Sequence, residues 1–147
     1  MTIFFQRKRI GCIKKISNHL GNAIQCLYTY ENRDKGSLIL NYLVTGAGGF
    51  IGGAVVTALV KAGHSVVTID NFSTGFRGQI PGGVEVIEGN CYEELVIKKL
   101  SGIKLDAIMH IAGQSSGEVS FDDPVYDLQT NVQSTVMLMK HALSICL

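Results

Sequence analysis

The sequence predicts an α/β protein built on a doubly wound parallel sheet. From residue 41 onward, short apolar runs typical of buried strands alternate with segments whose apolar residues recur at helical spacing. Such alternation is typical of parallel strands joined by right-handed helical crossovers. A glycine-rich turn follows the first strand, and polar or small residues follow the others, at the strand ends where ligands bind in such sheets.

The first strand, turn and helix lie within residues 41–62. The turn reads Thr-Gly-Ala-Gly-Gly-Phe-Ile-Gly (45–52), so that Gly46, Gly49 and Gly52 fall three residues apart. A diphosphate can lie against a helix N-terminus only where the backbone comes close and no Cβ intervenes. One interpretation is an ordinary strand–helix turn, and the other is a dinucleotide site of the Rossmann type.

The second strand, residues 65–69, favours the dinucleotide interpretation. It ends at Asp70, which lies 18 residues beyond Gly52, and an acid in that place can accept hydrogen bonds from both hydroxyls of an adenosine ribose. A carboxylate would also repel a 2′-phosphate, so the sequence predicts NAD rather than NADP, although the nearby base Arg77 leaves some room for NADP.

The remaining strands place further candidates at the same sheet edge. A third strand over residues 84–88 ends at Gly89 and Asn90, and a helix is expected over 93–100. A fourth strand over 106–111 is apolar enough to be buried on both faces and ends at Ala112 and Gly113. Because the carboxyl ends of parallel strands meet at one edge, we expect these residues to surround one ligand.

The last element is predicted to be a helix over residues 124–146. Asp123 before Pro124 is typical of a helix start. Its apolar stripe is predicted to pack on the sheet or on a partner helix, and it consists of Val125, Leu128, Val132, Val136, Met139 and Leu143. Asn131 lies in this helix and either bonds a neighbouring group or faces solvent.

Composition excludes several classes of function. The chain has 147 residues, enough for one domain, with 46% hydrophobic and 17% charged residues, which are globular values. A net charge of +1 gives no reason to expect nucleic acid, and no apolar run approaches the length of a membrane span. The cysteines match no zinc or redox motif, which predicts reduced thiols in a cytoplasmic protein. They are Cys12, Cys26, Cys91 and Cys146.

Residues 1–38 differ from the rest and are predicted to be a poorly structured, basic N-terminal extension. Five bases and no acid occur between Met1 and Tyr30, without a clean strand or helix pattern. A basic amphipathic arm for a membrane surface or organelle import is the alternative. We expect residues 39–147 to form a partial NAD-binding domain.

Four motifs give the chain a family resemblance. They are Val-Thr-Gly-Ala-Gly-Gly-Phe-Ile-Gly (44–52), Ile-Asp-Asn-Phe-Ser-Thr-Gly (69–75), His-Ile-Ala-Gly (110–113) and Asn-Val-Gln-Ser-Thr (131–135). With them, residues 41–146 resemble the extended short-chain dehydrogenase/reductase family, and within it the NAD-dependent nucleotide-sugar epimerases and dehydratases. The resemblance implies that NAD is bound by Gly46, Gly49, Phe50, Ile51, Gly52, Asp70, Asn71, Ser73, Thr74, Gly75, Asn90, Ala112 and Gly113.

The resemblance also assigns roles beyond the cofactor. The family usually has an acid that contacts the adenine amino group in the place of Asn90, whose amide carbonyl still accepts such a bond. Asn131 resembles a helix residue that supports the active-site geometry, and His110 resembles a structural residue rather than a catalytic base. The helix from Pro124 resembles one that forms a homodimer interface, and the substrate implied is a sugar nucleotide such as a UDP-hexose.

The family's catalytic pair, Tyr-x-x-x-Lys, is missing from the sequence. None of its five tyrosines has a lysine four residues later. We therefore expect the N-terminal portion of a longer enzyme, truncated after four strands, inactive alone and with an unpaired sheet edge. The alternatives are a stand-alone, non-catalytic dinucleotide-binding module and part of another Rossmann-type NAD(P)-dependent reductase.

Overall fold

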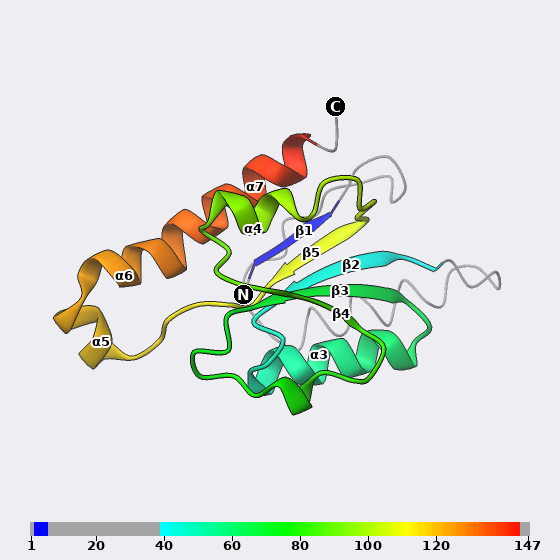
Figure 1. Cartoon of the computed structure of the whole chain (residues 1–147), viewed down its shortest axis with the longest axis horizontal. Coiled ribbons are helices and arrows are strands. Elements are labelled where there is room, and N and C mark those ends of the chain that lie inside the picture. Colours follow the sequence, from blue (N-terminus) through cyan, green and yellow to red (C-terminus); the bar gives the residue numbers. More distant parts are fainter. Residues whose placement is uncertain (1, 6–38, 145–147) are drawn as a thin grey trace.

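The computed structural model describes residues 2–5 and 39–144. Its elements surround a five-stranded sheet with the strand order β1-β5-β2-β3-β4 (Figure 1). In chain order they are β1 (Thr2–Phe5), β2 (Asn41–Thr45), α3 (Phe50–Lys61), β3 (Ser65–Asp70), the 3₁₀ turn η1 (Arg77–Gln79), β4 (Glu85–Glu88), α4 (Glu94–Lys98), β5 (Ala107–His110), α5 (Gly117–Asp122), α6 (Pro124–Leu128), the π-helical segment η2 (Gln129–Gln133) and α7 (Ser134–Ser144).

Strands β2 to β5 are parallel, which confirms the four-stranded Rossmann-like sheet. The central strand β2 pairs with β3 on one side and β5 on the other, so that Thr45 lies opposite both Ile69 and His110. The chain therefore reverses direction across the sheet beside β2, at the position where doubly wound sheets hold their ligands.

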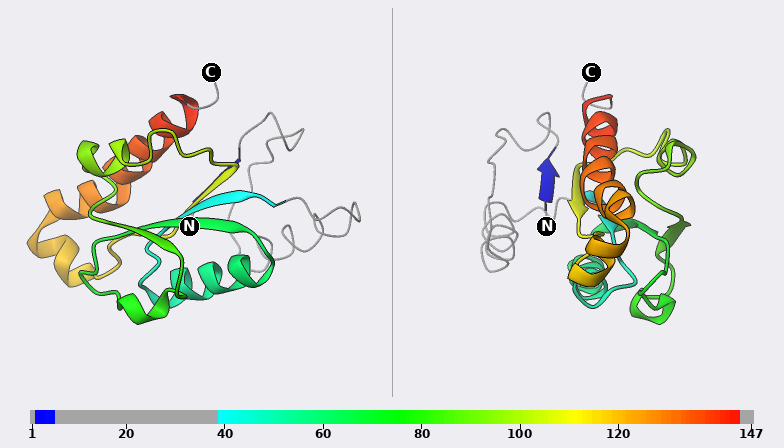
Figure 2. Two further views of the ribbon diagram at one scale, coloured as in Figure 1. Left: turned by 45° about the vertical axis from the view of Figure 1, so that its right-hand side comes forward. Right: turned by 90° about the vertical axis from the view of Figure 1, so that its left-hand side faces the viewer.

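Both faces of the sheet are covered by helices, on opposite sides of the strands (Figures 1 and 2). Because side chains alternate along a strand, Leu43 packs in one core cluster with α4 and α7, whereas Tyr42 and Val44 pack in the other cluster with α3. Val56 of α3 and Leu138 of α7 are fully buried in their respective clusters. This two-sided burial explains why the strands lack a polar face.

Strand β1 was not predicted. It pairs antiparallel with β5, with Thr2 opposite His110 and Phe5 opposite Ala107. The expectation of an unpaired β5 edge is therefore wrong, because β1 occupies that edge. The other N-terminal predictions, including the basic extension and the linker, fall on residues 6–38, outside the described residues.

The predicted final helix is divided, and its apolar stripe does not pack on the sheet. A separate helix, α5, precedes it, and a π-helical segment (η2) interrupts it between α6 and α7. Every member of the stripe is exposed, from Met139 at 44% to Leu143 at 65%, and Leu138 faces the core instead. The prediction that the stripe packs on the sheet is therefore wrong, and packing on a partner helix stays a prediction.

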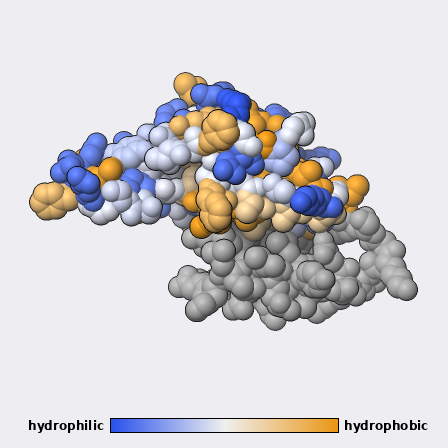
Figure 3. Space-filling view, turned by 90° about the horizontal axis from the view of Figure 1, so that it is seen from below, coloured by the Kyte–Doolittle hydropathy of each residue, from blue (hydrophilic) through white to orange (hydrophobic). Residues whose placement is uncertain are grey.

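Apolar and polar residues are intermixed on one face of the described part. On the face seen from below, apolar side chains lie among polar ones rather than in one band (Figure 3). None of the helices within the described residues combines the length and apolarity needed to cross a membrane.

Candidate functional site

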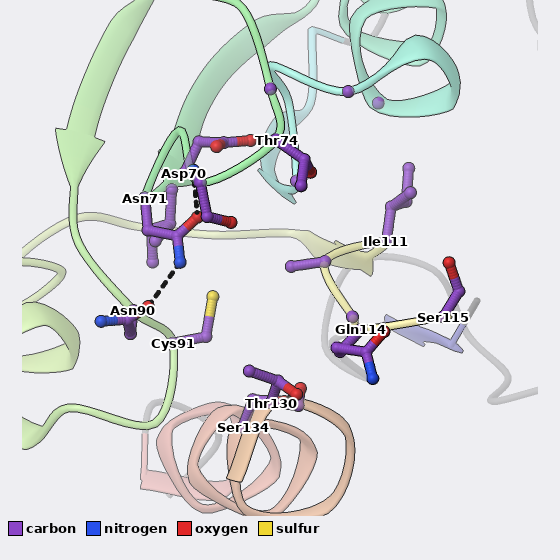
Figure 4. Close-up of a pocket in the computed structure, with 18 of the residues that line it drawn as sticks. Asp70, Asn71, Thr74, Asn90, Cys91, Ile111, Gln114, Ser115, Thr130 and Ser134 are labelled. Atoms are coloured by element: carbon purple, nitrogen blue, oxygen red, sulfur yellow. Dashed lines mark hydrogen bonds between the residues drawn. The ribbon is translucent and has the colours of Figure 1, made fainter. Parts of the chain in front are cut away.

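A pocket of about 650 Å³ opens at the carboxyl ends of the parallel strands (Figure 4). All of the residues predicted to form the site line it, although they come from separate stretches of the chain. They are Gly46, Gly49, Phe50, Ile51, Gly52, Asp70, Asn71, Ser73, Thr74, Gly75, Asn90, Ala112 and Gly113.

The three spaced glycines of the turn have different reasons to lack a side chain. Gly46 has a φ of 72°, and a Cβ there would lie 2.7 Å from the backbone nitrogen of Ala112. A Cβ on Gly52 would lie 1.9 Å from the Gly46 carbonyl oxygen, so helix α3 can approach the turn only with glycine. A Cβ on Gly49 would have one neighbour within 4 Å, the Gly46 carbonyl oxygen at 3.4 Å. The fold requires Gly46 and Gly52, whereas Gly49 lines the pocket at a position where the fold has room for a Cβ.

The N-terminus of α3 lies at the pocket without a side-chain cap. Gly49 is the N-cap residue, no hydrogen bond from a described side chain caps the helix, and its first turn contains no acid. The first N–H groups of a helix lack intrahelical acceptors and carry the positive end of the helix dipole. Since Gly49, Phe50 and Ile51 line the pocket, this end of α3 is suited to an anionic ligand such as a diphosphate.

Asp70 places a buried carboxylate beside the turn. Its side chain accepts hydrogen bonds from the backbone N–H of Gly48 and of Phe72, both at 2.7 Å and each to a different oxygen. The residue is 7% exposed. Each carboxylate oxygen retains a second lone-pair direction, so Asp70 can hold the turn and still accept hydrogen bonds from two ligand hydroxyls.

Two asparagines form the neighbouring wall. The Asn71 Nδ2 donates to the Asn90 Oδ1 at 2.6 Å (Figure 4), and the Asn90 amide nitrogen in turn donates to the Glu93 carboxylate. The carbonyl oxygen of Asn90 therefore already has one donor, and a ligand amino group would use its second lone pair.

A buried hydrogen-bond chain lies below the pocket and centres on His110. The Thr45 Oγ1 lies 2.7 Å from the His110 Nδ1 and accepts the backbone N–H groups of Ile111 and Ala112. The His110 Nε2 lies 3.1 Å from the Ser134 Oγ, which donates to the Thr130 carbonyl. With these partners, Thr45 donates to Nδ1, and His110 donates through Nε2. Burial lowers the pKa of His110 to about 4, so this histidine is neutral and structural.

Sequence reasoning missed the part of the pocket contributed by the later helices and by Cys91. Tyr126, Thr130 and Ser134 line the pocket, and their spacing of four residues was a signal that could have identified them. Burial raises the pKa of the Cys91 thiol to about 12, which makes it a poor nucleophile. The described residues contain no cluster of His, Cys, Asp and Glu side chains suited to a metal ion.

Asn131 does not line the pocket but supports its wall. Its side chain bonds the backbone of Gln114, a lining residue, in both directions: Oδ1 accepts from the N–H at 3.0 Å, and Nδ2 donates to the carbonyl at 2.8 Å. The interpretation in which Asn131 faces solvent is therefore wrong.

Comparisons with known proteins point to one family. The family model described as "NAD dependent epimerase/dehydratase family" matches residues 42–145. A UDP-glucose 4-epimerase of Streptomyces lividans is 34% identical over 101 residues, which are 67% of this chain and 31% of the relative. The chain thus spans about a third of the length of such relatives.

Solved structures give the same result. The structure of a Thermus thermophilus UDP-glucose 4-epimerase in complex with NAD matches with a TM-score of 0.66 and 29% identity, covering 72% of this chain and 34% of that one. A Thermotoga maritima UDP-glucose 4-epimerase with UDP-glucose matches with a TM-score of 0.67 and 27% identity, covering 72% and 35%.

Proposed function

Because the chain belongs to the NAD-dependent epimerase/dehydratase family, we propose that its pocket binds NAD and that the chain is the cofactor-binding portion of an enzyme acting on a sugar nucleotide such as a UDP-hexose. The observation that carries the proposal is the presence of two complementary groups on one pocket. The uncapped N-terminus of α3 suits the diphosphate, and the Asp70 carboxylate suits the adenosine ribose.

The electrostatics of the pocket support NAD over NADP. A ribose 2′-phosphate beside Asp70 would place like charges together in a largely buried position. Arg77 is the lysine or arginine nearest in sequence to this acid, and its guanidinium pairs with Glu88 and lies 4.6 Å from the centre of the Phe72 ring. Recruiting Arg77 to a phosphate would require breaking the pair with Glu88.

In this proposal the residues of the chain bind and orient NAD. We expect the chain alone to catalyse no turnover. Bound NAD supplies a reversible hydride acceptor. Within the 147 residues, no tyrosine has a lysine four positions later, so the chain lacks the pair that the family resemblance assigns to proton transfer. Interconversion of a UDP-hexose by the purified chain would contradict this proposal.

The exposed stripe of α6, η2 and α7 supports a homodimer. The stripe runs through Leu128, Val132 and Val136, each more than half exposed, and exposed apolar side chains that recur along consecutive helical segments are typical of an interaction surface. A second copy of the chain offers an identical face, as a two-fold interface requires. We place the protein in the cytoplasm, where NAD and sugar nucleotides are available and thiols such as Cys91 stay reduced.

Thermal melts with each dinucleotide test the proposal. A ligand at 100 times its dissociation constant adds about 2.7 kcal/mol to the free energy of unfolding. We expect NAD to raise the melting temperature and NADP to leave it almost unchanged. A cooperative melt that neither dinucleotide shifts would refute NAD binding by this chain.

A further inference from the structure

The loop that follows β5 packs closely between the glycine-rich turn and the segment η2. On one side, Gly46 of the turn contacts the backbone of Ala112, where an added Cβ would lie 2.7 Å away. On the other side, a Cβ on Gly113 would lie 2.8 Å from the Asn131 Oδ1. Residues 112–116 all line the pocket, so the position of Asn131 decides where this wall of the pocket stands.

Asn131 pairs with the loop backbone through one donated and one accepted hydrogen bond, as a residue of a neighbouring strand does. Its amide makes one accepting and one donating bond to the backbone of Gln114, at 3.0 and 2.8 Å. These bonds form only in one orientation of the amide, with Oδ1 toward the N–H of Gln114. A rotated amide would place two donors together and two acceptors together.

The carboxylate of Asp127, four residues earlier in α6, sets that orientation. Its Oδ1 accepts hydrogen bonds from the Asn131 Nδ2 at 3.0 Å, the Gln114 Nε2 at 3.0 Å and the Ser120 Oγ at 2.8 Å. A carboxylate only accepts hydrogen bonds, so it requires the nitrogen of both amides to face it. One oxygen atom thereby joins α5, α6, η2 and the loop.

We propose that Asp127 is a positioning residue that orients Asn131 and Gln114 and so places the 113–116 wall of the pocket for the far end of a bound dinucleotide. The inference rests on the proposed NAD site and adds a residue that lies outside its lining. Gln114 and Ser115 lie across the pocket from Asn71 and Asn90 (Figure 4). Loss of the Asp127 carboxylate therefore affects a ligand that reaches across the pocket more than one confined to the Asp70 side.

The test compares Asp127→Ala and Asp127→Asn with Asp122→Asn, a control that removes the same charge from an exposed position. NAD and AMP are titrated into each protein, with binding followed by NMR chemical shifts. For Asp127→Ala we expect NAD to bind about tenfold more weakly, a change of about 1.4 kcal/mol, and AMP affinity to stay within about twofold. Asp127→Asn keeps an acceptor oxygen and should recover most of the NAD affinity.

Amide hydrogen exchange supplies a readout that needs no ligand. Asp127→Ala should speed exchange at Gln114 and in the adjoining loop, while the strands β2 and β3 keep wild-type protection. Unchanged exchange at Gln114, or equal losses of NAD and AMP affinity, would overturn the inference. Failure of the wild-type chain to bind NAD would instead refute the proposed function, and the exchange measurement would still decide whether Asp127 positions the loop.

Discussion

The Asp70 carboxylate accepts the backbone N–H of Gly48 at 2.7 Å, so the acid that ends β3 also fixes the glycine-rich turn that follows β2. A Cβ on Gly48 would lie 3.3 Å from the Asp70 Cγ and 2.9 Å from the Phe72 ring, which leaves little room for a side chain. The group proposed to select the ribose and the turn proposed to hold the diphosphate are therefore one connected unit.

Replacement of Asp70 by asparagine tests the ribose role. Asp70→Asn keeps an acceptor oxygen for one backbone N–H but removes the charge, so we expect NAD affinity to fall about tenfold. NADP affinity should rise at the same time, because the repulsion of the 2′-phosphate is lost. Calorimetric titration of both dinucleotides measures the ratio, with Asp122→Asn as the charge-matched control. An unchanged ratio would mean that Asp70 does not face the ribose.

Gly49 and Gly52 should respond differently to the same added methyl group. Gly52→Ala should destabilise the fold by at least about 3 kcal/mol, because its Cβ would overlap the Gly46 carbonyl oxygen. Gly49→Ala should change stability by no more than about 1 kcal/mol, because Gly49 has an extended backbone that alanine adopts and an open neighbourhood.

Urea unfolding and NAD titration separate the two effects. Gly49→Ala should remain folded and lose NAD affinity, because its methyl group occupies space in the pocket. A Gly49→Ala protein that binds NAD as the wild type does would exclude the diphosphate from this position.

The sequence predicted the parallel sheet and the residues that line one pocket at its edge because both depend on local patterns. Apolar strands, the spaced glycines and Asp70 are each encoded within a few residues, and the carboxyl ends of parallel strands necessarily meet at one edge. This shared edge was sufficient to predict that Gly46, Asp70, Asn90 and Gly113 lie around one pocket.

The features that were not predicted depend on tertiary contacts. Strand β1 forms by pairing with β5, more than 100 positions away in the chain, and no local pattern encodes such a partner. The helical stripe from Val125 to Leu143 is apolar enough for the core, yet its side chains are exposed and Leu138 of α7 is buried instead. The π-helical segment η2 lies between α6 and α7, and no local sequence signal predicted this interruption of the helix.

The stability of the fold should depend on pH through His110. Burial lowers its pKa from 6.5 to about 4, so the unfolded chain binds more protons than the folded one between these values. Stability is therefore full above pH 6.5 and falls as the pH drops toward 4, by about 3 kcal/mol for this residue. Protonation would also place a second donor at Nδ1, against the Thr45 hydroxyl.

Urea unfolding between pH 4 and 7 measures this dependence. His110→Gln lacks the titrating group and should show a shallower slope than the wild type. The pKa of His141 is also lowered by burial, but this residue is present in both proteins and does not affect their difference. Equal slopes would mean that His110 is not buried as a neutral imidazole.

Cys91 should resist alkylation although it lines the pocket. With a pKa raised to about 12 by burial, about one thiol in 10,000 is ionised at pH 8, and the thiolate is the reactive form. Iodoacetamide should modify Cys91 at least about a hundredfold more slowly in the folded chain than in urea, as followed by peptide mass spectrometry. Equal rates would show that the pocket does not bury this thiol.

A charge placed in the exposed stripe should separate the two copies of the proposed homodimer. Val136 is 56% exposed on α7, and Val136→Asp would introduce a carboxylate into an apolar interface, where burial of an unpaired charge is costly. Sedimentation velocity should show a wild-type dimer and a Val136→Asp monomer, and the variant should still bind NAD. Val60→Asp, on α3 across the sheet, is the matched control and should remain dimeric. A monomeric wild type, or a Val136→Asp dimer, would remove the stripe as the contact between copies.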